Sequence, residues 1–258
     1  MTAPGTDPRP LLLLPPSKGK AAGGDGPTYP STLTTSTSLC TARTQVLATV
    51  RSDLDGLDDR ALARIAGVRA KDVDEARAEL RSLDEAATLP AHRRYTGVVH
   101  GNAGLAGLDP AQLEVDVRIV SALAGLVELT QPLPPYRLEF AASLPSLGGI
   151  ATWWRDRLAD HLGEVVAARR VWDLLPGEHA RVWNRRARAS GEVVEIAFVR
   201  PDGGAANAAR TKVCKGRLAA FLIATAETDV DTVVSEADPG EGWKLASDAR
   251  GIRATFIG

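Results

Sequence analysis

The sequence of 258 residues is 44% hydrophobic and 24% charged, which excludes an intrinsically disordered chain and leaves room for one large domain or two small ones. Its 31 basic and 32 acidic residues give a formal net charge of -1, so no overall positive charge attracts nucleic acid. No uncharged apolar segment reaches about 18 residues, and the two cysteines, Cys40 and Cys214, lack CxxC spacing; we therefore expect a cytoplasmic protein without a membrane span, a disulfide or a metal site.

A short strand is expected at residues 11–14, LLLL, because an aliphatic run without alternation, ended by two prolines, is typical of a strand buried on both faces. The loop that follows brings Ser17, Lys18 and Lys20 to the carboxyl end of this strand, where open α/β sheets bind ligands. An anion site is one interpretation, although the P-loop pattern is absent, and a lysine-bearing surface loop is the other. Residues 21–37 are rich in Gly, Pro, Ser and Thr and predict a flexible loop.

Residues 58–82 predict a helical hairpin, in which the turn AGVRA joins two short helices. This element is similar to a helix-hairpin-helix motif, whose backbone N–H groups bind a DNA phosphate. Gly67 and Val68 match that motif, whereas Arg69 replaces its second glycine and Lys71 follows. An ordinary packed hairpin is the alternative, because the surrounding stretch is rich in Asp and Glu.

The middle of the chain is expected to form strands and extended loops. RRYTGVVHGN (93–102) has the β propensity of Tyr and Val and predicts a strand that shares its segment with a functional loop. The apolar stretch at 118–129 predicts a central strand, broken at its glycine. Prolines exclude a helix from 130–140, so this extended loop presents Tyr136 and Arg137.

The remaining helices and strands alternate without the period of a barrel or a solenoid. Helices are expected at 39–50, 150–162, 178–188 and 211–225, and strands at 169–175, 191–199 and within 242–257. Together the elements predict one mixed α/β (α+β) domain over 1–258. It has a central mixed sheet, surrounding helices and the hairpin as an insertion.

Established catalytic and metal-binding patterns are absent from the sequence, including GxSxG, HExxH and a GxGxxG that follows a strand. The four histidines lack ligand spacing. His161 and His179 fall in helical stretches and are expected on the surface, so only His100, in a Gly-rich segment, is a candidate site residue. We expect neither a metal ion nor a cofactor.

Five short segments, taken in order, resemble the YaaA family of bacterial peroxide stress proteins. They are PPSKGK at 15–20, RRYTGVVHG at 93–101, SALAG at 121–125, QPLPPYRLEF at 131–140 and KVCKGR at 212–217. The residues that match include Ser17, Gly19, Lys20, Tyr95, Tyr136, Arg137, Leu138, Glu139 and Lys212. Lys18, His100 and Ala124 depart from the family pattern.

The resemblance implies a single-domain mixed α/β fold with a helix-hairpin-helix element and a positively charged cleft that suits DNA. It also implies a cytoplasmic role in limiting oxidative damage linked to iron. The favoured hypothesis is a non-enzymatic protein of the peroxide-stress response that binds nucleic acid. Its phosphate-binding candidates, which we expect to converge on one cleft, are Ser17, Lys18, Lys20, Gly67, Arg69, Lys71, Arg94, Tyr95, Tyr136, Arg137, Lys212, Lys215 and Arg217.

Other hypotheses stay open. An enzyme acting on a nucleotide or nucleobase would use a phenol, a guanidinium and a carboxylate side by side for recognition and acid–base work. Its candidate catalytic residues are Ser17, Tyr95, Arg137 and Glu139. The structural alternative is a latch, in which Arg137 is paired to a carboxylate and Tyr136 is packed. Direct sequestration of iron is a further hypothesis, for which the sequence shows no cluster of ligands.

Overall fold

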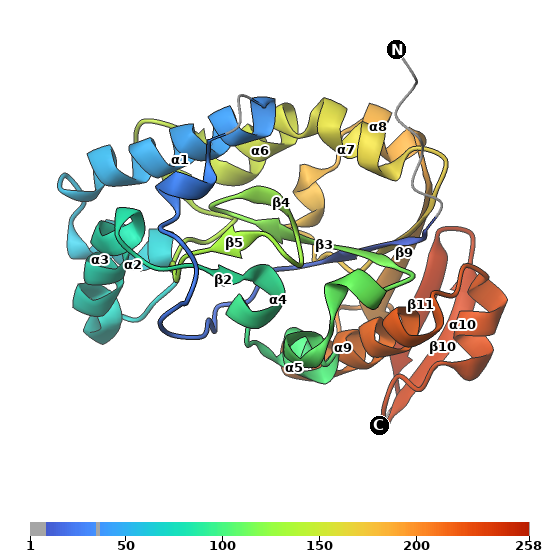
Figure 1. Ribbon diagram of the computed structural model, residues 1–258. Coiled ribbons are helices and arrows are strands. Elements are labelled where there is room, and N and C mark those ends of the chain that lie inside the picture. Colours follow the sequence, from blue (N-terminus) through green and yellow to red (C-terminus); the bar gives the residue numbers. More distant parts are fainter. Residues whose placement is uncertain (1–8, 35–36, 258) are drawn as a thin grey trace, which may run out of the picture.

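A seven-stranded mixed sheet runs through the middle of the molecule (Figure 1). The computed structural model describes residues 9–34 and 37–257. The strand order is β10-β11-β9-β8-β1-β3-β4; the pairs β3/β4 and β10/β11 are antiparallel and the other neighbours are parallel. The strands are β1 (Leu11–Leu14), β3 (Asp116–Ser121), β4 (Gly125–Glu128), β8 (Arg170–Asp173), β9 (Glu192–Val199), β10 (Trp243–Asp248) and β11 (Gly251–Phe256).

Helices lie on both faces of this sheet (Figure 1). One layer contains α1, α6, α7 and α8, and the other contains α4, α5 and α9, while α2 and α3 stand together at one end of the molecule. The helices are α1 (Ser38–Leu54), α2 (Asp59–Ala66), α3 (Val73–Arg81), α4 (Ala91–Arg94), α5 (Val98–Asn102), α6 (Ile150–Arg157), α7 (Ala159–Val166), α8 (Arg185–Ala189), α9 (Ala208–Thr225) and α10 (Val230–Glu236). Two small sheets pair β2 (Leu89–Pro90) with β5 (Pro132–Leu133) and β6 (Ser143–Leu144) with β7 (Gly148–Gly149).

The predicted strand at 11–14 is confirmed as β1, near the centre of the sheet. All four leucines are fully buried, because β3 and β8 flank the strand and a helical layer covers each face. Single-domain mixed α/β architecture is likewise confirmed. The loop after β1 therefore starts from one of the most firmly packed points of the fold.

The helical hairpin at 58–82 has the predicted shape. Asp58 caps α2 by accepting a hydrogen bond from the Ala61 amide (2.7 Å). Gly67 ends the helix in the left-handed region (φ 64°), which favours glycine. The amides of Gly67 and Val68 both donate to the Ala63 carbonyl, so these two N–H groups are already used within the turn.

The strand predicted at 93–102 is wrong, because the segment forms α4 and α5. Only Tyr95, between the two helices, keeps a strand-like pairing, an isolated antiparallel bridge to Lys20. α5 packs along α9, where a Cβ at Gly216 would lie 2.7 Å from the Val99 carbonyl oxygen. This close helix packing outweighs the β propensity of the valines.

Three further elements differ in extent from the predictions. The central strand at 118–129 is a hairpin of β3 and β4, because Gly125 turns the chain with φ 71°. The helix at 150–162 is divided into α6 and α7. The basic helix predicted at 178–188 is only a 3-10 turn (Ala180–Val182) and α8, which begins where Asn184 caps the Ala187 amide.

The predicted loop at 21–37 is irregular over its described part, apart from one 3-10 turn at Pro30–Thr32. It carries fully buried Tyr29 and is hydrogen-bonded from the Ala21 amide to the Arg94 carbonyl (2.8 Å). Residues 35–36 lie outside the described residues, and the flexibility of the loop stays a prediction. Across 9–34 and 37–257, no helix combines the length and apolar character needed to cross a membrane.

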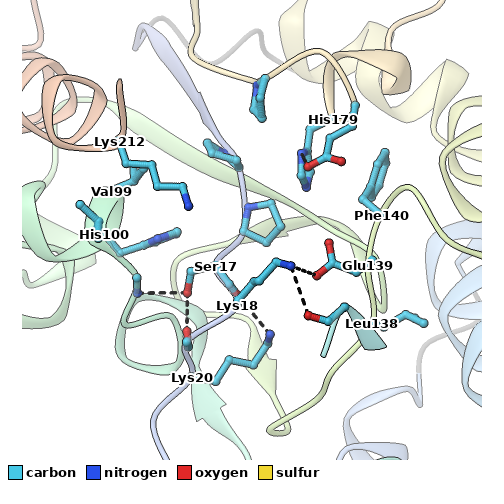
Figure 2. Close-up of a pocket in the computed structure, with 18 of the residues that line it drawn as sticks. Ser17, Lys18, Lys20, Val99, His100, Leu138, Glu139, Phe140, His179 and Lys212 are labelled. Carbon is cyan, nitrogen blue, oxygen red and sulfur yellow. Dashed lines mark hydrogen bonds and ion pairs between the residues drawn. The ribbon is translucent and has the colours of Figure 1, made fainter. Parts of the chain in front are cut away.

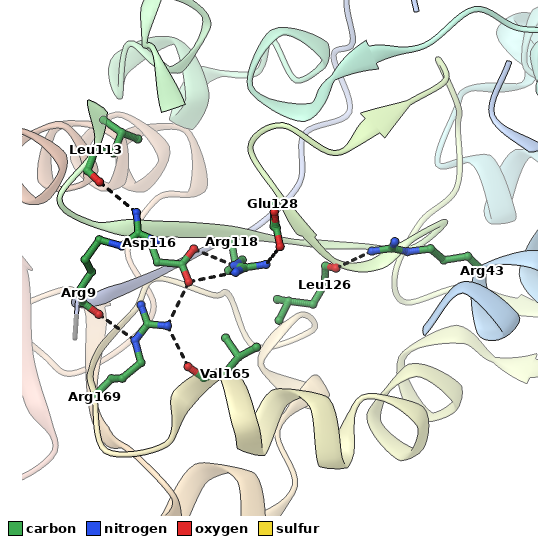
Figure 3. A network of polar contacts seen from close by, with 9 residues as sticks. All are labelled: Arg9, Arg43, Leu113, Asp116, Arg118, Leu126, Glu128, Val165 and Arg169. Carbon is green, nitrogen blue, oxygen red and sulfur yellow. Dashed lines mark hydrogen bonds and ion pairs between the residues drawn. The ribbon is translucent and has the colours of Figure 1, made fainter. Parts of the chain in front are cut away.

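A network of charged side chains fastens the amino end of the parallel strands (Figure 3). Buried Asp116 accepts hydrogen bonds from Arg118 (2.8 Å) and from Arg169 (3.1 Å). Arg118 also pairs with Glu128 of β4 (2.6 Å), and Arg169 donates to the Arg9 carbonyl (2.8 Å). Asp116 is in register with the first residue of β1, so this network lies at the strand end opposite the loop that follows β1.

Candidate functional site

A pocket of about 440 Å³ lies at the carboxyl end of β1 (Figure 2). Its lining residues come from segments within 15–20, 66–68, 97–100, 136–140, 176–179 and 208–215. The loops after β1 and β8 meet here because the two strands are parallel neighbours and end at the same edge of the sheet. The pocket therefore joins parts of the chain that are nearly two hundred residues apart.

The loop after β1 is held by its own polar groups. The Ser17 hydroxyl donates to the Gly19 carbonyl and accepts from the Gly97 amide (3.1 Å). A side chain at Gly97 would collide with Ser17, which explains the glycine. Lys18 pairs with Glu139 (2.8 Å), so the residue that departs from the family pattern neutralises the only carboxylate of the 136–140 loop.

Lys20 is one of two lysines in the lining whose pKa is lowered by burial. Its ammonium group donates to the Ser17 carbonyl (2.9 Å) and lies 4.0 Å from the centre of the Tyr136 ring. Burial lowers the pKa of Lys20 to about 8, although the carboxylates of Glu79 and Glu139 oppose this shift. At neutral pH the amine is therefore still mostly protonated, but it loses its proton more readily than an exposed lysine does.

Tyr136 connects the pocket to a buried row of hydroxyl groups. Its hydroxyl lies 2.7 Å from that of Tyr95 and 2.9 Å from that of Ser121. Burial raises the pKa of Tyr95 to about 12 and that of Tyr136 well above its usual value, so both phenols are uncharged. Tyr136 lines the pocket, whereas Tyr95 lies in contact with Tyr136 and is not part of the lining.

Two histidines, His100 and His179, line opposite sides of the pocket (Figure 2), and we call them the pocket histidines. His100 is 1% exposed and packs against the Tyr95 ring (5.2 Å), and His179 is 7% exposed and stacks on Phe140 (5.0 Å). Burial lowers the pKa of His100 to about 3 and that of His179 to about 4. Both rings are therefore neutral, and the prediction that His179 lies on the surface is wrong.

Two lysines of α9 complete the lining. The side chain of Lys212 extends into the pocket (Figure 2), and within the described part of the chain its ammonium group has no ion-pair partner. Lys215 is buried and donates to the Leu174 carbonyl. Burial lowers the pKa of Lys215 to about 8, against the nearby carboxylate of Asp173.

Most of the predicted phosphate-binding residues come together at this pocket. Those in the lining are Ser17, Lys18, Lys20, Gly67, Tyr136, Arg137, Lys212 and Lys215, together with the catalytic candidate Glu139. A Cβ at Gly67 would overlap the Glu139 carboxylate. The turn of the hairpin is therefore part of the pocket wall.

The predicted arginines are all paired with other groups of the protein. Arg137 lines the pocket but is paired with Glu79 (2.7 Å) and Glu75 (3.1 Å) of α3, which raise its pKa. Arg94 is fully buried and binds main-chain carbonyl oxygens. Arg69, Lys71 and Arg217 are outside the lining; Arg69 pairs with Asp72 (3.1 Å) and Arg217 with Asp238, while Lys71 is exposed.

Sequence reasoning missed several lining residues, among them Phe140, His179 and Thr211. Phe140 follows directly after the matched Tyr-Arg-Leu-Glu segment. His179 could be found from topology, because the loop after β8 must end beside the loop after β1. Thr211 precedes Lys212 on the same turn of α9.

No metal centre is apparent in the described residues. Among 9–34 and 37–257, no group of three His, Cys, Asp or Glu side chains is placed to hold a metal ion. Both cysteines are buried and free of disulfides, and burial raises the pKa of Cys214 to about 12. A thiolate that reacts with peroxide needs the opposite shift.

The fold and the pocket define a class of protein: a mixed α/β domain with a pocket lined by lysines and neutral histidines at the carboxyl end of its central strands. The family model described as peroxide stress protein YaaA matches residues 11–247. The chain belongs to this family, and the resemblance predicted from five short segments is confirmed.

Curated relatives carry the family designation UPF0246. A UPF0246 protein of Streptomyces coelicolor is 29% identical over 252 residues, which cover 94% of this chain and 95% of the relative. One of Corynebacterium efficiens is 30% identical over 234 residues, 90% and 92% of the two chains. One of Corynebacterium glutamicum is 33% identical over 156 residues, 60% and 61%. The first two matches extend over nearly the whole domain.

Proposed function

We propose that this protein acts in the peroxide-stress response by binding a phosphate-bearing partner, a nucleic acid, in the pocket after β1. The observation that carries the proposal is the position of Ser17, Lys20 and Lys212 around one hollow. A hydroxyl and two ammonium groups are suitable partners for phosphate oxygens. The family description supplies the physiological context, and we assign the role to the cytoplasm, where the two buried thiols would stay reduced.

The size of the pocket determines how a nucleic acid enters it. A volume of about 440 Å³ suits a small molecule or a single nucleotide but not a double helix. The amides of Gly67 and Val68 are bonded to Ala63, so the hairpin turn offers a phosphate fewer donors than the motif it resembles. We therefore favour a DNA strand that inserts one unstacked nucleotide, as enzymes and binding proteins that flip bases require.

A salt titration tests this proposal. Fluorescence anisotropy of a labelled single-stranded oligonucleotide and of a duplex would give the dissociation constant at several salt concentrations. Binding should weaken steeply with salt, and Lys212→Gln should reduce the logarithmic slope by about one. Lys244→Gln, which removes an exposed lysine on β10 outside the pocket, is the matched control and should leave the slope unchanged. Equal slopes in the two variants would contradict the proposal.

A second candidate is an enzyme acting on a nucleotide or nucleobase. The observation in its favour is the Lys20 amine, whose pKa of about 8 suits proton transfer and which lies in the same lining as the Glu139 carboxylate. Release of free base or inorganic phosphate from nucleotides should then be measurable and should be lost in Lys20→Met. The absence of turnover in the wild-type protein, together with intact binding, would leave the non-enzymatic proposal standing alone.

A further inference from the structure

Three polar side chains of the pocket lack the partners that buried groups normally have. Both ring nitrogens of His100, Nδ1 of His179 and the hydroxyl of Thr211 are buried and accept or donate no hydrogen bond within the described residues. A Glu178 carboxylate oxygen lies 3.5 Å from His179 Nδ1, too far for a good hydrogen bond. Most buried polar atoms in folded proteins have a hydrogen-bond partner, so these atoms, on three side chains that line one pocket, point to a ligand that completes them.

The charge state of the pocket histidines limits the kind of ligand group they bind. Burial and the neighbouring ammonium groups of Lys20 and Lys215 keep both rings uncharged. A neutral imidazole offers one donor and one acceptor, whereas an anion would be bound better by the lysines. The histidines therefore suit an uncharged group that itself has both donors and acceptors.

The shape of the pocket wall further restricts the kind of ligand group that fits. The His179 ring is nearly parallel to that of Phe140, with an interplanar angle of 20°. Apolar side chains such as Pro15, Val99 and Leu138 form much of the remaining lining. A pocket with such a lining suits a flat, largely apolar group with polar edges.

We propose that the pocket histidines and Thr211 recognise a nucleobase, while the lysines hold its phosphate. This inference rests on the proposed function and narrows it to a partner that carries a base. Figure 2 shows the arrangement: His100 and Lys212 lie on one side of the pocket, and His179 and Phe140 lie on the other. The three residues are then specificity-determining side chains that touch the base edge.

Calorimetric titration of five small compounds tests the inference. The compounds are the four deoxynucleoside 5′-monophosphates and deoxyribose 5-phosphate, which has the phosphate but no base. At least one nucleotide should bind roughly tenfold more tightly than deoxyribose 5-phosphate, because the base makes hydrogen bonds to buried partners that deoxyribose 5-phosphate cannot make.

Variants assign this difference to the named side chains. His179→Phe keeps a ring against Phe140, and Thr211→Val keeps the size of the side chain; each should reduce the advantage of the nucleotide by roughly fivefold and leave the binding of deoxyribose 5-phosphate unchanged. His161→Phe, in α7 and outside the pocket, is the control and should change neither affinity. Thr211→Val also serves if His179→Phe fails to fold.

The outcomes separate the inference from the function on which it rests. If deoxyribose 5-phosphate binds as tightly as all four nucleotides, the base is not recognised, although the phosphate site stands. If the variants bind nucleotides as the wild-type protein does, the histidines and Thr211 are not the groups that recognise it. If none of the five compounds binds, the phosphate site is refuted together with the inference.

Discussion

Replacement of Arg94 by methionine should destabilise the protein strongly without weakening its binding of phosphate. Fully buried Arg94 donates four hydrogen bonds, to the carbonyl oxygens of Leu133 (3.0 Å), Ala21, Gly23 (2.8 Å) and Ala87 (3.1 Å). Methionine fills similar space but donates none. If each lost bond costs about 1 kcal/mol, the free energy of unfolding should fall by about 3 to 4 kcal/mol. This corresponds to a decrease in Tm of about 6 to 16 °C.

The neighbouring arginine provides the control. Arg93 is half exposed and makes one long ion pair, with Asp25 (3.4 Å), so Arg93→Met should cost less than about 0.5 kcal/mol. Thermal and guanidinium unfolding followed by circular dichroism would measure both variants. If Arg94→Met were as stable as Arg93→Met and yet lost its affinity for oligonucleotides, Arg94 would be a ligand-binding group, and its role as a buried anchor of the surrounding loops would be refuted.

Three other changes have defined outcomes. Gly125→Ala should lower the free energy of unfolding by about 2 to 4 kcal/mol, because φ at Gly125 is 71° and a Cβ would lie 2.6 Å from the Trp154 ring. Gly101→Ala is the control, because nothing lies within 4 Å of the added Cβ, and it should be neutral or slightly stabilising. Acidification from pH 6.5 to about 4.5 should lower the free energy of unfolding by roughly 2 kcal/mol through His179 alone. The reason is that, above the folded-state pKa of about 4, only the unfolded state binds a proton at this residue. Thermal melting across this pH range should therefore show a smaller loss in His179→Phe. The two buried thiols should react with a chromogenic disulfide reagent only after unfolding, and rapid reaction of the native protein would contradict their burial.

Local patterns in the sequence were sufficient to predict several of the segments that form the pocket. Four consecutive leucines ended by prolines predicted a buried strand, and the polar loop after it lies in the pocket. The segments around Tyr136 and Lys212 also reach the pocket as expected. These predictions succeeded because they depend on short-range features: proline geometry, aliphatic runs and the rule that loops follow strand ends.

Predictions that depend on tertiary packing failed. Val98 and Val99 favour strands in isolation, but α5 is helical because it packs along α9. The sequence offered the pairing of Arg137 with a carboxylate only as the latch alternative, and it could not identify Glu75 and Glu79 of a distant helix as the partners. His179 was missed because its burial follows from the position of β8 beside β1, which is a property of the sheet and not of any nearby residues.

The pocket lies between the loop after β1 and the first turns of α9, which begins at residue 208. On a ribosome, these two segments are synthesised far apart in time. A nascent chain that stops before α9 leaves the tunnel has made its leucine strand but has no complete hollow beside it. Under the proposed function, affinity for the phosphate-bearing partner arises late in translation, and prematurely terminated products should not compete with the finished protein for that partner.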